Sequence, residues 1–209
     1  MRFLLALLLL APLRAEVDTA PLEAWLKRQA GIRTLEADFT QERKLPALKN
    51  PVTTPGTLAM TRDGKLRWDL GQPAKTIAVS DGEKVTLVDV EKKQARSIDA
   101  DSPRARSFTM LSGDSINGGL ESFRKSFDLV ESRVTQGIYQ LTTRPKDRNM
   151  RGKVSWVFFD IDPGKNELRA LEIQLDDKSR IRTIFRNSRF NRDIPAARFN
   201  VDLSGYEVR

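Results

Sequence analysis

The chain has 209 residues with no histidine and no cysteine, and 36 lysines and arginines against 28 aspartates and glutamates give it a formal net charge of +8. Without cysteine there is no disulfide, no thiolate metal site and no lipid-modified cysteine, and without histidine the commonest general base and metal ligand is missing. The length suits one domain whose core needs neither a metal nor a disulfide. We therefore expect no enzyme, no cofactor and no metal, and a carboxylate-based hydrolase stays open as an alternative.

The first fifteen residues have the order of a secretory signal. Arg2 precedes an unbroken apolar run over residues 3–11, and the small residue Ala15 suits a cleavage point. The run is far shorter than the roughly 20 residues that a membrane-spanning helix needs, so we expect no permanent membrane anchor. We predict a signal peptide over residues 1–15, a single domain over residues 16–209, and export to the periplasm.

A helical pattern follows the signal. Thr19 can cap a helix, Pro21 suits its first turn, and Gly31 marks its end. Three apolar residues between these points share one helical face, namely Leu22, Trp25 and Leu26. The pattern predicts a short amphipathic helix.

From Thr34 onward the apolar residues recur with a period of two. Leu35, Ala37 and Phe39 alternate with polar residues, which is typical of a strand with one buried face. Turn signals then recur at strand-length intervals, at Pro55-Gly56, Asp63-Gly64, Gly71 to Pro73, Asp81-Gly82, Gln136-Gly137, Asp162 to Gly164 and Asp176-Asp177. Short strands joined by tight turns predict a single, strongly curved antiparallel sheet.

A stretch after residue 101 interrupts the strand pattern. Ser102 and Pro103 look like the start of a helix. The apolar residues that follow have near-helical spacing, namely Phe108, Leu111, Ile116, Leu120 and Phe123. Because Gly113 and Gly118-Gly119 break this spacing, we predict two short helices as an insert in the sheet.

Oxygen-bearing side chains gather near residue 160 without forming a calcium loop. Asp160, Asp162, Asn166 and Glu167 supply suitable ligand atoms, but their order does not match the EF-hand loop. Pro163-Gly164 instead predicts a hairpin turn.

Basic residues alternate with apolar ones near the end of the chain. Arg180, Arg182 and Arg186 are interleaved with Ile181, Thr183 and Phe185, which is typical of a solvated outer sheet face opposite a buried one. Aromatic residues that would stack on bases are not concentrated beside them. We therefore expect no nucleic-acid partner.

Three stretches, in order, carry a resemblance to a known family. Leu35 to Gln41 reads LEADFTQ, Gly56-Thr57-Leu58 leads to RDGKLRW at Arg62 to Trp68 and VSDG at Val79 to Gly82, and residues 183–199 read TIFRNSRFNRDIPAARF. They resemble the first long strand, the second hairpin with its following turn, and the closing Ile-Pro pattern of LolA-type outer-membrane lipoprotein carriers. The resemblance covers nearly the whole mature chain.

The resemblance implies a mainly β (α+β) fold: an incomplete antiparallel β-barrel of about 10–11 strands with a short helical lid over an apolar concave face. It implies a periplasmic carrier, monomeric, that shuttles lipoproteins or related acylated lipids from an inner-membrane donor complex to an outer-membrane acceptor. The inward strand residues expected to line the lipid cavity are Phe39, Leu58, Met60, Leu66, Trp68, Ile77, Val79, Trp156, Phe158 and Phe185. The expected lid residues are Trp25, Phe108, Leu111 and Arg62, of which Arg62 matches the arginine that bonds to the lid helix in the family.

The chain departs from the family pattern at two places. Asp63 follows Arg62 where the family usually has proline, and residues 85–88 read VTLV where it usually has tryptophan and tyrosine. Residues 43–54 also resemble LolA-like proteins encoded with lipid or polyene biosynthesis. Two alternatives stay open: a carrier for a non-lipoprotein lipid or polyene product, and a sensor or interaction module in envelope signalling, as in RseB-type regulators.

Overall fold

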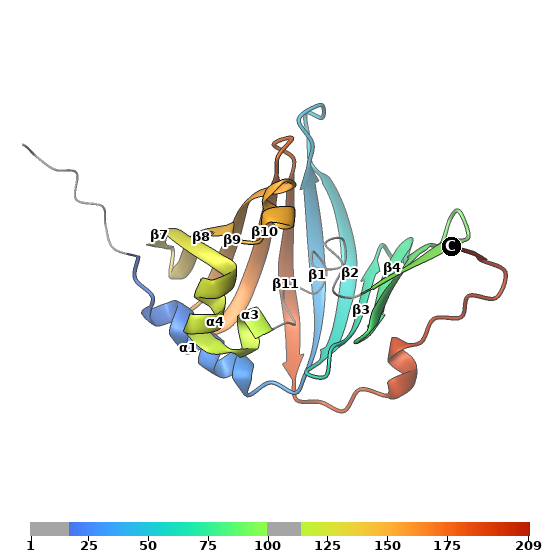
Figure 1. Ribbon diagram of the computed structural model, residues 1–209, viewed down its shortest axis with the longest axis horizontal. Helices are drawn as coiled ribbons and strands as arrows, with labels where there is room; N and C mark the ends of the chain where they lie inside the picture. Colours follow the sequence, from blue (N-terminus) through green and yellow to red (C-terminus); the bar gives the residue numbers. More distant parts are fainter. Residues whose placement is uncertain (1–16, 100–113) are drawn as a thin grey trace, which may run out of the picture.

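A computed structural model describes residues 17–99 and 114–209, which form one open, curved sheet with the N-terminal helix and two central helices grouped on one side (Figure 1). The twelve strands are ordered β12-β6-β5-β4-β3-β2-β1-β11-β10-β9-β8-β7. All neighbours pair antiparallel except β12 and β6, which are parallel. The predicted unclosed antiparallel sheet is confirmed, with slightly more strands than expected.

The strand bounds follow the predicted turns closely. They are β1 (Thr34–Lys44), β2 (Val52–Thr61), β3 (Lys65–Leu70), β4 (Thr76–Asp81), β5 (Lys84–Asp89), β6 (Gln94–Asp99), β7 (Phe127–Thr135), β8 (Ile138–Pro145), β9 (Val154–Asp162), β10 (Glu167–Leu175), β11 (Arg180–Phe190) and β12 (Glu207–Val208). The helices are α1 (Ala20–Ala30), α3 (Asp114–Asn117), α4 (Gly119–Ser126), α5 (Arg148–Arg151) and the 3-10 turn η1 (Ala196–Phe199).

Helix α1 has the predicted bounds and the predicted buried face. Its start is held by Asp18, whose Oδ1 accepts from the Ala20 amide at 3.0 Å, while the Thr19 hydroxyl donates to Glu23 at 2.7 Å. Leu22, Trp25 and Leu26 are buried on the sheet side. These contacts confirm the predicted amphipathic helix, with Asp18 in place of Thr19 as the side chain that caps the main chain.

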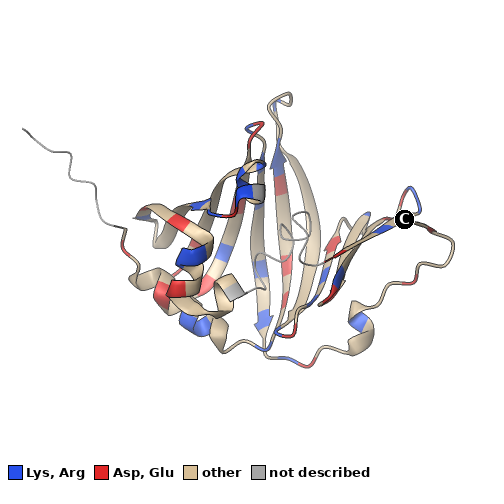
Figure 2. Cartoon of the chain, in the orientation of Figure 1, with Lys and Arg blue, Asp and Glu red and all other residues tan. Residues whose placement is uncertain are grey.

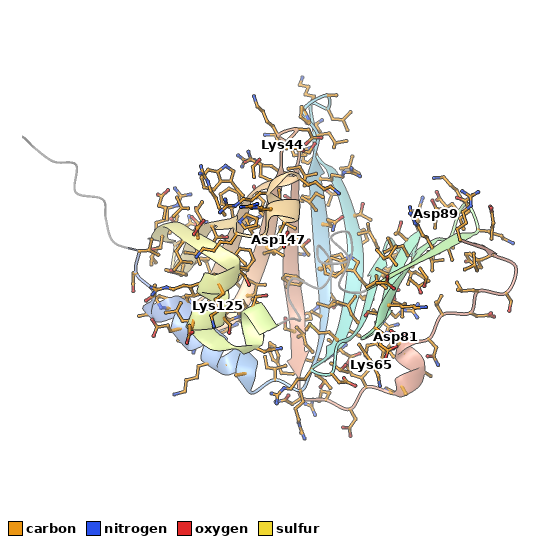
Figure 3. All side chains as sticks on the ribbon, viewed as in Figure 1. Lys44, Lys65, Asp81, Asp89, Lys125 and Asp147 are labelled. Atoms are coloured by element: carbon orange, nitrogen blue, oxygen red, sulfur yellow. The ribbon has the colours of Figure 1, made fainter. Side chains whose placement is uncertain are left out.

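The central insert contains the second part of the predicted helical pair. Helices α3 and α4 are separated by Gly118, and α4 buries Phe123 while Lys125, labelled in Figure 3, stays exposed beside Glu121 at 3.1 Å. The expected helix start at Ser102 and Pro103 lies outside the described residues. The sequence did not predict α5, whose first turn is capped by the Asp147 carboxylate.

Helices α1, α3 and α4 pack on one another, and α1 also packs on β9. We call the sheet face under these helices the inner face and the opposite one the outer face. The main apolar cluster lies on the inner face and joins α1, α3 and α4 to strands on both sides of β1. The core therefore sits between the helices and the curved sheet, as expected for a layered α+β fold.

A second, smaller apolar cluster lies on the outer face of β4 to β6. The chain leaves β11, forms η1 and then runs along the outer side of β3 and β4 to the end of the sheet (Figure 1). Arg67 on β3 donates to the Asn200 carbonyl at 2.9 Å. Val201, Leu203 and Tyr206 pack against the cluster, whose buried members are Ile77, Val79, Val88 and Ala95. The C-terminal segment (residues 191–208) thus covers this half of the sheet from outside.

Lys and Arg lie among Asp and Glu on strands and helices alike (Figure 2). The predicted outer-face arginines are confirmed for β11, where Arg180 and Arg182 both pair with Glu172 of β10, at 3.2 and 3.3 Å. No helix within the described residues is long and apolar enough to cross a membrane.

Candidate lipid-binding site

Four aromatic rings form a tight group beneath the helices. Trp25 of α1 and Phe123 of α4 contact Phe159 of β9, with ring centroids 6.1 and 5.3 Å apart. Phe127, at the start of β7, completes the group at 4.9 Å from Phe123 and 5.7 Å from Phe159. We call these four residues the helix-side cluster. Every member is at least 98 % buried, so the helices and the sheet are joined here by a dry aromatic contact.

Three further rings lie together on the sheet itself. Phe39 of β1 lies 4.2 Å from Trp68 of β3, and Phe185 of β11 contacts both at 6.5 and 6.4 Å between centroids. Phe39 reaches Trp68 across Gly56 of β2, where any Cβ would lie 2.2 Å from the Phe39 ring. We call Phe39, Trp68 and Phe185 the sheet cluster. Its rings come only from strands, and Trp68 remains partly exposed.

A small cavity of about 40 Å³ lies between the two clusters. Trp25 and Gln29 line it from α1, and the sheet supplies Leu35, Ala37, Leu58, Met60, Leu168, Phe185, Ser188 and Phe190. Pockets that hold drug-sized ligands are roughly 300–1,000 Å³, so this cavity is too small for an acyl chain. A long chain can bind here only if α1 moves away from the sheet.

Polar contacts hold the C-terminal end of α1. Arg62, in the turn between β2 and β3, donates from Nε to the Ile32 carbonyl at 3.1 Å and from its terminal nitrogen to the Ala30 carbonyl. A cation beside the last carbonyls of a helix is favourable because the helix dipole is negative there. Arg28 adds an ion pair with Glu167 of β10 at 3.0 Å. The contact expected between Arg62 and the helix backbone is therefore present.

The N-terminal end of α1 is held by a buried tyrosine. The Tyr139 hydroxyl on β8 donates to the Asp18 carbonyl at 2.5 Å, and Ser132 on β7 accepts from the Asp18 amide at 3.0 Å. Burial of the neutral phenol raises the pKa of Tyr139 to about 12. Both ends of α1 are thus fixed by hydrogen bonds to the sheet, with an apolar middle between them.

Seven of the predicted site residues meet on the inner face. They all belong to the main apolar cluster, either buried or packed against it, and are Trp25, Phe39, Leu58, Met60, Leu66, Trp68 and Phe185. Phe108 and Leu111 lie outside the described residues. The sequence thus correctly predicted the inward side chains of α1, β1 to β3 and β11.

The inner face predicted for Ile77 and Val79 is wrong. In the register of β3 and β4, Ile77 pairs with Asp69 and Val79 with Arg67, while Ala78 pairs with the inner residue Trp68. Ile77 and Val79 therefore face outward, beneath the C-terminal segment. A strand that is covered on both faces reads as a continuous apolar run, so alternation could not identify the inner side.

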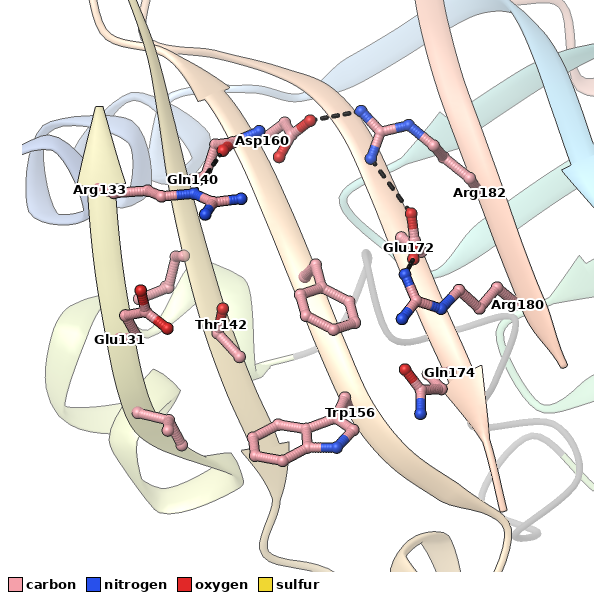
Figure 4. A pocket seen from close by; sticks show the side chains of 13 residues that line it. Glu131, Arg133, Gln140, Thr142, Trp156, Asp160, Glu172, Gln174, Arg180 and Arg182 are labelled. Atoms are coloured by element: carbon pink, nitrogen blue, oxygen red, sulfur yellow. Dashed lines mark hydrogen bonds and ion pairs between the residues drawn. The ribbon is translucent and has the colours of Figure 1, made fainter. Parts of the chain in front are cut away.

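The inner face predicted for Trp156 and Phe158 is also wrong. Both line an outer-face groove of about 480 Å³ together with Thr142, Asp160 and Glu172 (Figure 4). A slip of one residue exchanges every side chain between the faces. The inner residues of β9 are instead Val157, Phe159 and Ile161, all completely buried.

A signal for the true face of β9 is present in the sequence. Asp160 belongs to the same alternate set of strand positions as Trp156 and Phe158, so these three side chains share one face. The other set, residues 157, 159 and 161, is entirely apolar. The other inner residues that the site prediction omitted are buried members of the main cluster, including Leu22, Leu26, Ile116, Phe123, Tyr139, Leu141 and Leu171. Most of them lie in the helices or in β8. The sequence pattern predicted these elements, but their apolar residues were not assigned to the site.

The carboxylates near residue 160 have structural partners. The carboxylate of Asp160 forms an ion pair with Arg182, and Oδ1 of Asp162 accepts from the Gly164 and Lys165 amides at 3.0 and 3.2 Å. The second pair of bonds builds the predicted hairpin turn. Within residues 17–99 and 114–209 no group of acidic side chains is arranged to hold a metal ion.

An open antiparallel sheet whose apolar inner face lies under a tethered amphipathic helix defines a class of half-barrel proteins. The model of the family described as "Outer membrane lipoprotein carrier protein LolA" matches residues 30–202. The chain therefore belongs to the LolA family.

Individual relatives agree with this assignment. An outer-membrane lipoprotein carrier protein of Dechloromonas aromatica is 32% identical over 80% of this chain and 76% of its own length. One of Pseudomonas fluorescens is 26% identical over 97% of this chain and 94% of its own length. Among solved structures, an uncharacterized conserved protein from Thermus thermophilus has the same fold with a TM-score of 0.53 and 7% identity, covering 90% of this chain and 96% of that one.

Proposed function

We propose that this protein is a periplasmic carrier that holds the acyl chains of lipoproteins, or of related acylated lipids, against the inner face of its sheet. The signal-like residues 1–15 direct export, and residues 16–209 act as a single monomeric domain. The protein receives cargo from an inner-membrane donor and passes it to an outer-membrane acceptor. Membership of the lipoprotein-carrier family and the names of its relatives support this role.

One observation carries the proposal: the apolar side of α1 covers a face of the sheet that is itself apolar from β8 to β3. When α1 moves away, Leu22, Trp25 and Leu26 lose burial worth roughly 1.5–3 kcal/mol each. A long acyl chain recovers on the order of 10 kcal/mol, at ~0.8 kcal/mol per methylene and before ordering costs. The two quantities are similar, so cargo can replace the helix without a large net change in free energy.

This balance also explains how cargo would leave. The chain contains no phosphate-binding loop, so release needs a partner that binds the lipid more strongly. The helix then returns to the sheet and recovers its burial. Transfer therefore runs down an affinity gradient, with α1 closing behind the departing lipid.

The test is binding of a triacylated lipopeptide to the purified protein, followed by mass spectrometry of lipids that copurify from the periplasm. Trp68→Ala on the inner face should weaken lipopeptide binding at least tenfold, because it removes a wall of the site. Trp156→Ala is the matched control, since Trp156 is also partly buried but lies on the outer face.

Equal binding by wild type and both variants would contradict an inner-face site. Absence of any bound or bindable acylated molecule would reject the carrier role altogether. Copurification of a lipid that is not attached to protein would keep the site but change the cargo to a non-lipoprotein lipid.

A further inference from the structure

Among the described residues, two buried side-chain polar atoms have no hydrogen-bond partner, Nε1 of Trp25 and Oγ of Ser179, and of these two residues only Trp25 lines the cavity beneath α1. Trp25 is 2% exposed, and its Nε1 has no hydrogen-bond partner. A buried donor without a partner costs roughly 1–3 kcal/mol, and such groups are rare in folded proteins. A phenylalanine would fill similar space without this cost, so the N–H needs an explanation beyond packing.

Trp25 lines the cavity of about 40 Å³ beneath α1. The volume is close to that of one water molecule or one carbonyl group, far below that of an acyl chain. Its other lining side chains are apolar except for Gln29 and Ser188, both only partly buried. The cavity wall thus contains a tryptophan whose N–H has no partner, and its other polar side chains lie where the wall meets the surface.

The spacing along α1 places Gln29 on the same side of the helix as Trp25. Gln29 lies four residues after Trp25, so the two share one helix face about one turn apart. The polar end of a lipid would remain near Gln29 and Ser188, which are partly exposed, while its hydrocarbon follows the apolar inner face. The first polar atom beyond the hydrocarbon is the carbonyl oxygen of the acyl group, which accepts hydrogen bonds and brings no donor of its own.

We propose that the Trp25 indole N–H donates a hydrogen bond to the acyl carbonyl of the bound lipid, and so distinguishes acyl chains from plain alkyl chains. This inference rests on the proposed carrier function and adds a recognition contact to it. The carbonyl can belong to a glyceryl ester or to an N-acyl amide, because both present the same acceptor. The contact also fixes how deep the chain lies, since the carbonyl is at a set distance from the headgroup.

The test compares three probes whose chains have the same total number of carbons: 1-palmitoylglycerol, palmitoylethanolamide and 1-O-hexadecylglycerol. The first has an ester carbonyl, the second an amide carbonyl and the third none. Wild type should bind at least one carbonyl probe about fivefold more tightly than the ether. Trp25→Phe should remove this preference while still binding the ether, and Trp156→Phe, which removes an outer-face indole, should retain it.

A spectroscopic measurement separates a direct contact from a change in packing. The indole 15N–1H resonance of Trp25, identified by its loss in Trp25→Phe, should move downfield with a carbonyl probe and not with the ether. Preference for the ester alone assigns the contact to a glyceryl ester, and preference for the amide alone assigns it to an N-acyl group.

Three results would each overturn the inference. Wild type could bind all three probes equally, or the preference could survive in Trp25→Phe. The indole resonance could also stay unmoved by every probe, as when only water occupies the cavity. Those outcomes leave the carrier function intact as long as the probes bind. If wild type binds none of the three probes, the triacylated lipopeptide takes their place: an unchanged affinity in Trp25→Phe overturns the inference, and no binding by wild type rejects the carrier function itself.

Discussion

The two aromatic clusters of the inner face are built differently. The helix-side cluster takes Trp25 and Phe123 from helices and Phe127 and Phe159 from strands, so it exists only while the helices rest on the sheet. The sheet cluster takes all three rings from β1, β3 and β11, whose pairing fixes them in place. One part of the apolar wall is therefore preformed, and the other would be exposed only if the helices moved away from the sheet.

Breaking the helix-side cluster should have the largest effect on stability. Phe159→Ala removes a fully buried ring from among its aromatic neighbours, and we expect a loss of about 3–5 kcal/mol in the free energy of unfolding. Chemical denaturation measures this. Phe158→Ala is the matched control, because its ring lies on the outer face, and it should cost much less. A larger loss in Phe158→Ala than in Phe159→Ala would show that the two faces have been exchanged.

The sheet cluster can be broken through a residue that has no side chain. Gly56→Ala would place a methyl group within 2.4 Å of two Phe39 atoms, and we expect a destabilisation of about 1–3 kcal/mol with a changed Trp68 fluorescence. Gly164→Ala is the control, since its nearest neighbour would lie at an ordinary 3.4 Å. Unchanged stability and fluorescence in Gly56→Ala would mean that Phe39 can move aside freely.

Removing Arg62 should loosen α1 and leave the strands of the sheet cluster unchanged. Arg62→Leu deletes the bonds to the Ile32 and Ala30 carbonyls, and we expect the closed lid to lose about 1–2 kcal/mol. Hydrogen exchange should rise at the end of α1 and stay unchanged in β1, and lipid loading or release should be impaired. Arg33→Leu removes a nearby charge as a control. An unchanged exchange pattern would remove Arg62 from the lid mechanism.

The smallest effect concerns the other end of α1 and depends on pH. The raised pKa of Tyr139, about 12, means that folding favours the neutral phenol. Its contribution is complete below pH 10 and is lost as pH rises from 10 through 12. Tyr139→Phe should cost about 1 kcal/mol at neutral pH and flatten this part of the stability curve. Equal stability of wild type and variant at neutral pH would mean that the hydrogen bond to Asp18 does not hold the helix, and a parallel loss above pH 10 would mean that burial does not raise the pKa of Tyr139.

The sequence predicted the elements well because their signals are local. Turn pairs such as Asp63-Gly64 and Asp81-Gly82 bound strands directly, and the spacing of Leu22, Trp25 and Leu26 defines the buried side of α1. Each of these signals depends on residues a few positions apart. They sufficed to predict a strongly curved antiparallel sheet and a short amphipathic helix, whereas the resemblance to the LolA family implied that the sheet is open and that helices cover one face.

The sequence could not assign the faces of β4 and β9 by alternation alone. On β4 the larger side chains, Ile77 and Val79, point outward because a segment from the far end of the chain covers them. On β9 two consecutive aromatic residues, Phe158 and Phe159, serve opposite faces. Only long-range packing decides which side chains of these strands face inward. On β9, the position of Asp160 on the same face as Trp156 and Phe158 offered a hint.

The C-terminal segment has a consequence for how the protein acquires its structure. Residues 201–206 shield Ile77 and Val79, and β1 pairs with β11, so much of the first half of the chain depends on partners from the last quarter. Contacts of such long sequence separation form slowly. A nascent chain therefore cannot complete its sheet early, because both the partner of β1 and the cover of β4 are synthesised last.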